Sequence, residues 1–158
     1  MYEWTGRNIG EPMIPSAKET IIALAELHLG ENYLDHNSCD EWVAKLLIGA
    51  KLEPSDYCLG DTSETVAQHI NELNTSNMDY SKTAYNSVYV VFMGDGTKSY
   101  TIGHEHAGLL SVGPAGEADF YHSSRNNEGA LSEKDSYKSV SAFESAYAYS
   151  SFYYQGIY

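Results

Sequence analysis

Cys39 has the residue type and the position of a nucleophile. It follows Ser38, which together with Glu41 has the spacing of a capping box at a helix N-terminus. Cys39 is thus expected in the first turn of a helix, where unpaired backbone N–H groups and the helix dipole favour thiolate over thiol. The same N–H groups can stabilise the oxyanion that forms when sulfur attacks a carbonyl carbon. The competing interpretation is a cysteine that only packs in the core, because most free cysteines are buried small apolar residues.

Two histidines are positioned to serve as a base and its orienting partner. His106 immediately precedes the apolar run 107–112, and His122 ends the next such run. The Gly-Pro-Ala-Gly segment 113–116 predicts a turn, so both histidines are expected at the same end of an antiparallel hairpin. A weak nucleophile needs an imidazole that is itself oriented by a third group. We therefore predict Cys39 as nucleophile, His106 as general base and His122 as orienter. The competing interpretation is that histidines at strand ends are solvated and idle.

Helices are predicted in the first half of the chain. A capping box at Ser16 and Glu19 precedes an apolar stripe that stops at Gly30. The second helix is the one that begins at Ser38. A third, shorter helix is expected over residues 61–73.

Strands are predicted in the second half. Residues 88–93 form a β-rich run that a Gly-Asp-Gly turn ends, which is typical of a central strand. The segment 123–136 is polar and no element is predicted there, and 141–149 has no clear preference. Further strands are expected at 98–102, 107–112, 118–122 and 152–158. The predicted fold class is α+β, with helices packed on an antiparallel sheet.

Length and charge limit the classes of protein that the chain can represent. Its 158 residues suit one domain, 1–158, with a single core. The net charge of −13, with nine Lys and Arg residues, argues against a nucleic-acid partner and against anionic membrane surfaces. The longest apolar runs are far shorter than the roughly 20 residues of a spanning helix. Residues 1–10 have no basic start and no unbroken apolar run, so no secretory signal is predicted there.

The two cysteines, Cys39 and Cys58, allow a different interpretation, because one disulfide between them would close a short loop. A domain of this size needs no such staple, and the two residues lie in different contexts, one opening a helix and one in an expected loop. We therefore expect two free thiols.

Several segments resemble the NlpC family of papain-like cell-wall hydrolases. They are Ala25 to Tyr33 followed by Ser38 to Val43, then Thr62-Ser63, Glu105 to Leu110 and Phe120 to Ser123, so that the resemblance covers roughly residues 17–125. It implies a papain-like fold and hydrolysis of peptidoglycan amide bonds through an acyl-enzyme, without a metal or organic cofactor. The related CHAP amidases share the order of cysteine and histidine.

The resemblance assigns site roles residue by residue. It implies Cys39 as nucleophile, His106 as base and His122 as the third polar position, and it gives Tyr33 and Ser38 weaker roles in holding the substrate or the oxyanion. The chain departs from the family after the cysteine, where small residues are usual and Asp40-Glu41 stand instead.

An acidic domain of this length without a secretory signal also resembles the amidase toxins that bacteria deliver to one another by type VI secretion. That resemblance implies export by a route without a signal peptide and action in the periplasm or cell wall of a target cell. It also implies a cognate immunity protein, for which the negative charge predicts a basic docking surface.

Three alternatives remain open. His104 and His106 are two residues apart and would share one face of a strand, so that with His122 or Cys39 they would make a metal site. A papain-like acyltransferase would use the same Cys–His pair. The third is a non-enzymatic binding module, in which the 14 tyrosines supply contact area, although strand packing explains them more simply.

Overall fold

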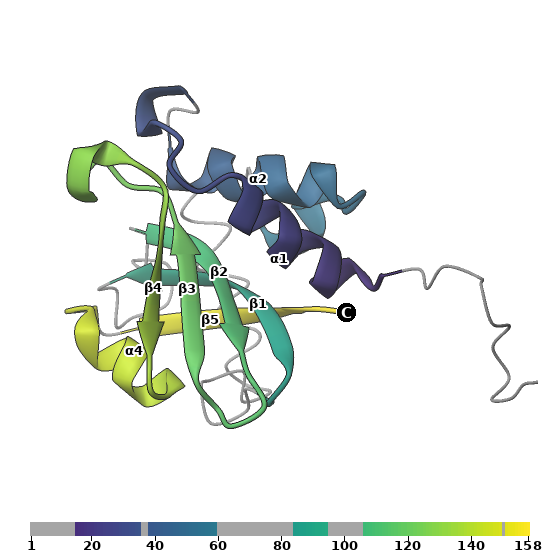
Figure 1. Ribbon diagram of the computed structural model, residues 1–158, viewed down its shortest axis with the longest axis vertical. Helices are drawn as coiled ribbons and strands as arrows, with labels where there is room; N and C mark the ends of the chain where they lie inside the picture. Colours follow the sequence, from purple (N-terminus) through teal and green to yellow (C-terminus); the bar gives the residue numbers. More distant parts are fainter. Residues whose placement is uncertain (1–14, 36–37, 60–83, 95–105, 150) are drawn as a thin grey trace, which may run out of the picture.

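Five antiparallel strands form the sheet on which the described part of the chain is built (Figure 1). The structure is a computed structural model, and it describes residues 15–35, 38–59, 84–94, 106–149 and 151–158. The strands lie side by side in the order β4-β3-β2-β1-β5. Their bounds are β1 Ser87–Gly94, β2 His106–Val112, β3 Ala118–His122, β4 Glu133–Tyr137 and β5 Ser151–Ile157.

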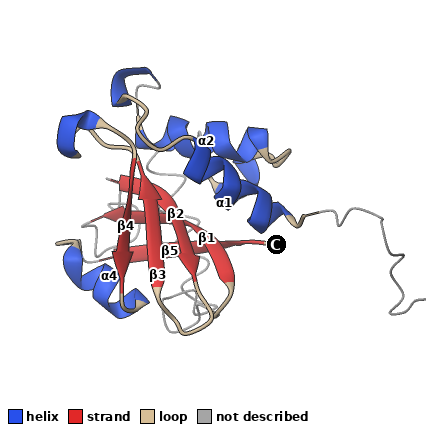
Figure 2. Cartoon of the chain, viewed as in Figure 1, coloured by secondary structure: helices blue, strands red, loops and turns tan. Residues whose placement is uncertain are grey.

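Helices cover both faces of this sheet (Figure 2). α1 (Ala17–Leu27) and α2 (Cys39–Gly49) pack on one face, and the short α4 (Val140–Ala146) packs on the other. In the described connections, 3-10 helices occur at η1 Tyr33–Asp35, η2 Pro54–Tyr57 and η4 Glu128–Ala130. The predicted α+β class, with N-terminal helices packed on an antiparallel sheet, is confirmed.

Both capped helices begin where the sequence predicts. The Ser16 hydroxyl accepts the Glu19 N–H, and the Glu19 carboxylate accepts the Ser16 N–H, so α1 has a complete capping box. At α2 the Ser38 hydroxyl accepts the Glu41 N–H at 3.1 Å. This cap satisfies one of the free amides of the first turn and fixes where Cys39 enters the helix.

Alternation along the strands divides the core into two layers. On the α1/α2 face the strands contribute Val88, Val90, Phe92, Ala107, Leu109, Tyr121, Tyr153 and Ile157, which pack against Ile21, Ala25, Trp42, Val43, Leu46 and Leu47. On the α4 face they contribute Tyr89, Val91, Met93, Leu110, Val112, Ala118, Phe120 and Tyr154, which pack against Val140 and Phe143. Tyr153 and Tyr154 are fully buried, so these two tyrosines are sheet core.

The hairpin of β2 and β3 forms as expected. The Gly113 N–H donates to the Glu117 carbonyl at 2.8 Å, and Gly116 takes a φ of +85°, a left-handed turn conformation that favours glycine. The strands pair Leu109 with Tyr121 and Val112 with Ala118. His106 and His122 therefore come together at the open end of the hairpin.

The structure differs from the sequence prediction at two elements. β4 occupies part of 123–136, where no element was expected, and α4 occupies part of the ambiguous segment 141–149. The closing strand predicted at 152–158 is β5, which pairs with β1. The helix predicted at 61–73 and the strand predicted at 98–102 lie outside the described residues. Among the residues described, no helix is both long and apolar enough to cross a membrane.

Candidate functional site

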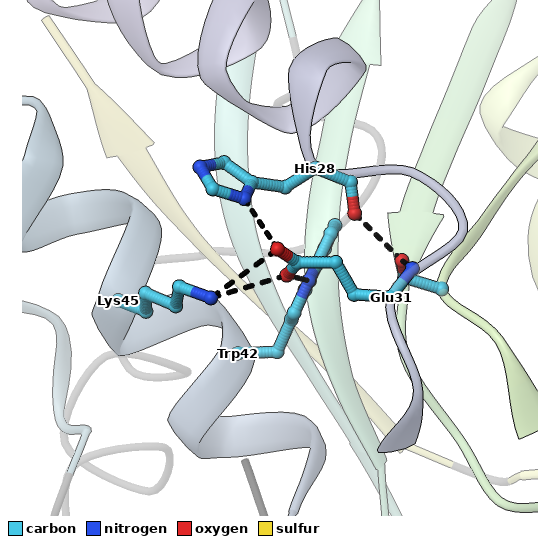
Figure 3. A network of polar contacts seen from close by, with 5 residues as sticks. His28, Glu31, Trp42 and Lys45 are labelled. Carbon is cyan, nitrogen blue, oxygen red and sulfur yellow. Dashed lines mark hydrogen bonds and ion pairs between the residues drawn. The ribbon is translucent and has the colours of Figure 1, made fainter. Parts of the chain in front are cut away.

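The helix that carries Cys39 is tied to α1 by the carboxylate of Glu31 (Figure 3). Trp42 of α2 donates its ring N–H to Glu31 Oε1 at 3.1 Å, and Lys45 Nζ lies 3.3 Å from both carboxylate oxygens. His28, just after α1, contacts Glu31 Oε2 through Nδ1 at 2.6 Å. Burial raises the pKa of this carboxyl, but the hydrogen bonds from His28 and Lys45 outweigh it, so the pKa is lowered overall.

The loop before α2 is also fastened to the start of β4. Ser132 donates its hydroxyl to the His28 carbonyl at 2.7 Å and accepts the Glu31 N–H at 2.9 Å. Backbone bonds from Gly30 N–H to Ser132 O and from Ser132 N–H to Glu31 O close the same contact. These bonds fix the position of the cysteine helix relative to β4, although the two are about a hundred residues apart in the chain.

Cys39 lies at the first position of α2, with its sulfur at the start of β2. The thiol donates to Asp40 Oδ1 at 3.3 Å, and the sulfur accepts the backbone N–H groups of Asp40 and Ala107. The two amides favour the thiolate, but burial and the charge of Asp40 outweigh them and raise the pKa of the thiol to about 12. The expectation that the helix terminus lowers this pKa is therefore reversed. Cys58 is buried, and both cysteines are free thiols, as expected.

His106 and His122 are joined directly. Nε2 of His106 lies 2.8 Å from Nδ1 of His122, and Nε2 of His122 lies 2.8 Å from Oδ2 of Asp135. The two residues are 8% and 4% exposed, so their imidazoles are buried polar groups that need such partners. The two histidines predicted to lie at one end of the hairpin are thus in contact, and Asp135 of β4 extends the pair to a third group.

The carboxylate at the end of this chain sets the direction of every hydrogen bond. An ionised Asp135 only accepts, so His122 must donate from Nε2 and, being neutral, must accept at Nδ1. His106 then donates from Nε2 and keeps a lone pair on Nδ1. This Nδ1 has no hydrogen-bond partner among the described residues. The chain therefore assigns the tautomer that a general base needs.

Both imidazoles are held neutral. Burial and, after it, the neighbouring His122 lower the pKa of His106 to about 3 against a weaker opposite effect of Asp40. Burial also lowers the pKa of His122, although the hydrogen bond and the charge of Asp135 oppose it. The resting site at neutral pH therefore holds a thiol and two neutral imidazoles.

A pocket of about 560 Å³ opens on the α4 side of the two histidines. His106, His122, Glu133 and Asp135 form its polar wall, and the aromatic wall includes Tyr137, Tyr147 and Tyr149. The rings of His106 and His122 are packed against Phe120, at centroid distances of 5.9 and 4.7 Å. A Cβ at Gly108 would lie 2.5 Å from the Phe120 ring, so this glycine makes room for the ring that supports both histidines.

Of the three predicted catalytic residues, His106 and His122 are in direct contact, whereas Cys39 lies on the other side of the sheet. The two histidine rings lie on the α4 side of the sheet, whereas Cys39 packs with the α1/α2 core. The two sides meet at the start of β2, where the sulfur contacts the peptide that links His106 to Ala107. Cys39 and His106 are therefore neighbours through the backbone of β2.

The two residues with weaker expected roles have other contacts. Ser38 uses its hydroxyl as the helix cap. Tyr33 has its ring under the Arg125 guanidinium, 5.4 Å from centroid to Cζ. His104, a member of the alternative metal set, lies outside the described residues.

Sequence reasoning missed Asp135 and Glu133. Both lie on β4 and face the pocket, with Glu133 opposite His122 in the strand register. The available signal was the alternation of residues 133–137, in which acidic side chains at every second position precede Tyr137.

Comparison of the chain with known protein families, with curated proteins and with solved structures finds no match.

Proposed function

We propose that the protein is a cysteine-dependent amidase or endopeptidase that cleaves amide bonds in the stem peptides or cross-links of peptidoglycan. The observation that carries the proposal is the chain from Asp135 through His122 to His106, which leaves Nδ1 of His106 with an unprotonated lone pair at the start of β2. The Cys39 sulfur contacts the adjoining peptide. A nucleophile, a base and an oriented third group are the parts that covalent amide hydrolysis requires.

The proposed reaction starts from a neutral thiol. As the Cys39 sulfur attacks the carbonyl carbon, its proton passes to Nδ1 of His106 through a water molecule at the start of β2, because the sulfur and the ring lie on opposite sides of the sheet. The new imidazolium is stabilised through His122 by the Asp135 carboxylate. The backbone N–H of Cys39, the first amide of α2, stabilises the oxyanion. His106 then returns the proton to the leaving amine, and water, deprotonated in turn by His106, releases the acyl group from sulfur.

The substrate class rests on the NlpC resemblance, and the papain-like form of the fold belongs to the same proposal. A helix led by cysteine and packed on an antiparallel sheet is compatible with it. The pocket of about 560 Å³ is large enough for a short peptide segment. We further propose that the protein acts in the cell wall of a target bacterium, and that an immunity protein with a basic docking surface neutralises it.

The direct test is digestion of purified peptidoglycan sacculi, with mass analysis of the soluble fragments. The wild type should release or shorten stem peptides and leave the sugar chains intact. Cys39→Ala and His106→Ala should each lose about 10³-fold or more, because nucleophile and base act as a unit, whereas His122→Ala should lose less. Cys58→Ala is the matched control and should retain activity. Absence of fragments from every peptidoglycan type would contradict the substrate class, and acyl transfer to an added amine without hydrolysis would favour the acyltransferase.

A finer test uses the direction of the hydrogen-bond chain. In Asp135→Asn the amide can donate to Nε2 of His122, which moves the His122 proton to Nδ1 and removes the lone pair from Nδ1 of His106. The isosteric Asn variant should therefore lose more activity than Asp135→Ala, in which water can accept from His122. Equal losses in the two variants would contradict the proposed role of the chain.

A further inference from the structure

We propose that His122, Glu133 and Asp135 form a binding site for a divalent cation of the zinc type, and that the bound cation switches off His106 as a base. The binding site stands on the geometry of these three residues alone. The switch rests on the proposed function, because it concerns the same base.

The three side chains already have nearly the spacing that such a cation needs. One donor atom from each residue lies within 4.8 Å of the others. Nε2 of His122 is 2.8 Å from Asp135 Oδ2 and 3.8 Å from Glu133 Oε1. Ligands at about 2.0–2.2 Å from a tetrahedral zinc ion are roughly 3.4 Å apart. Changes of about half an ångström in the two distances to His122, and of up to about 1.4 Å in the widest separation, would therefore complete a site with one imidazole and two carboxylates.

The backbone holds this set in place. Glu133 and Asp135 are two residues apart on β4 and so face the same side, and Glu133 pairs with His122 in the β3–β4 register. Lys134, between them, points to the other face, where it binds Glu26 at 2.8 Å. Among the described residues, neither Glu133 nor Asp135 is paired with Lys or Arg. Two carboxylates thus converge on a buried imidazole without a cationic side chain to balance them.

The site is open to an ion from solution. All three residues line the pocket of about 560 Å³. The two carboxylate side chains are 37% and 38% exposed, whereas that of His122 is 5% exposed. An ion can therefore approach from the pocket, bind the carboxylates and reach the imidazole, with water at the remaining position. A nitrogen ligand with carboxylates suits Zn²⁺ and neighbouring transition metals better than Mg²⁺.

A cation on His122 would reverse the hydrogen-bond chain. The metal takes the lone pair of Nε2, so the proton of neutral His122 moves to Nδ1, which then donates to Nε2 of His106. The proton of His106 correspondingly moves from Nε2 to Nδ1. Two protons are present on the two imidazoles before and after, so no net proton is released from them. His106 now carries N–H where the base needs a lone pair.

The binding test is calorimetric titration of the full chain with ZnCl₂, with MgCl₂ as the comparison cation. Zn²⁺ should bind with one site that Glu133→Gln weakens at least tenfold, whereas Glu128→Gln, a nearby exposed acid outside the set, should leave affinity unchanged. Mg²⁺ should bind at least tenfold more weakly than Zn²⁺. Equal Zn²⁺ affinity in wild type and Glu133→Gln would overturn the site.

The switch is tested by ¹⁵N NMR of the histidine rings, which reports which nitrogen carries the proton and needs no substrate. Saturating Zn²⁺ should move the His106 proton from Nε2 to Nδ1 in the wild type but leave it on Nε2 in Glu133→Gln at the same metal concentration. An unchanged His106 tautomer in the zinc-bound wild type would overturn the switch. Both readouts are independent of hydrolysis, so their failure is distinguishable from failure of the proposed function. If hydrolysis is observed, Zn²⁺ should lower its rate at least tenfold. A zinc-loaded enzyme of full activity would overturn the switch.

Discussion

The two faces of the sheet are built from the same strands but have different chemistry. The α1/α2 face is closed by two eleven-residue helices, and its interior is apolar around the fully buried Trp42. The α4 face is covered by a helix of seven residues. Beyond its apolar part lie His106 at the start of β2, His122 at the end of β3 and Asp135 within β4. Along β2 and β3, alternate side chains therefore point to the apolar core under α1 and α2 and to the face that carries the histidines.

The difference shows how a small domain can separate stability from reactivity. Apolar burial on the α1/α2 face contributes to the free energy of folding without creating polar groups that need partners. On the α4 face the short helix leaves the pocket open. There the pKa of each buried histidine is lowered, so both imidazoles stay neutral at a pH where an exposed histidine would be protonated. Substitutions on the first face should therefore act on stability, and substitutions at the pocket should act on the titration and chemistry of the site.

The largest expected effect is on the α1/α2 face. Trp42→Ala removes a fully buried ring and the indole donor to Glu31, so it should lower the free energy of unfolding by about 3–5 kcal/mol. Urea denaturation followed by circular dichroism measures this. Tyr149→Ala, at the half-buried rim of the pocket, is the matched aromatic truncation on the other face and should cost about 1 kcal/mol or less. Similar costs for the two variants would contradict the division of roles between the faces.

The second expected effect is a loss of stability in mild acid that originates on the α4 face. The pKa of His106 is lowered to about 3 in the folded chain from an ordinary value of 6.5, and that of His122 is also lowered. Between these values the unfolded chain binds a proton that the folded chain does not. Stability is therefore retained above pH 6.5 and falls as pH decreases toward 3, with a slope near pH 5 of about 1.4 kcal/mol per pH unit for His106.

This slope is measured by urea denaturation at several pH values from 7 to 5, above the range in which most carboxylates titrate. His106→Leu should show a shallower dependence, because it removes one of the two buried imidazoles. Ser111→Ala, on the same strand and without a titrating group, should keep the slope of the wild type. A His106→Leu variant with an unchanged slope would show that the acid sensitivity arises elsewhere.

The two faces also differ in how much the sequence predicts. On the α1/α2 face the helix caps at Ser16 and Ser38 and the apolar stripes behind them are local signals, and the structure confirms both helices. β1, β2 and β3 have apolar runs ended by turns, so they were predicted as well. The hairpin turn at 113–116 was enough to expect His106 and His122 at the same end, because an antiparallel register fixes which residues face each other.

β4 was missed because its sequence lacks an apolar face. Glu133 and Asp135 face the pocket, Lys134 and Ser136 face solvent, and the strand is held by its pairing with β3. A sequence pattern cannot detect a strand that is held by pairing with its neighbour and has no apolar face. The reversal of the Cys39 pKa has a similar cause. Sequence shows that the thiol starts a helix, but its burial by the sheet is a tertiary effect that outweighs the helix terminus.

The smallest expected effect concerns Asp40, which lies where the two faces meet. Its carboxylate accepts from the Cys39 thiol at 3.3 Å, and after burial its charge is the second cause that raises the thiol pKa to about 12. Asp40→Asn removes that charge while the amides of residues 40 and 107 still face the sulfur, so the pKa should fall. The thiolate fraction at neutral pH rises tenfold for each pKa unit, which predicts up to about tenfold faster alkylation by iodoacetamide.

Mass spectrometry of labelled peptides measures this rate for Cys39 separately from the buried Cys58. Wild-type Cys39 should react more slowly than a free thiol, because at neutral pH a thiol with a raised pKa holds little thiolate. Glu41→Gln is the matched control: it removes a neighbouring acidic charge that is exposed and is not among the causes of the shift. If Asp40→Asn and Glu41→Gln accelerate alkylation equally, a general reduction of negative charge explains the effect. If only Asp40→Asn accelerates it, the charge of Asp40 is what holds Cys39 as a thiol, and the reactivity of this sulfur is set at the boundary between the two faces.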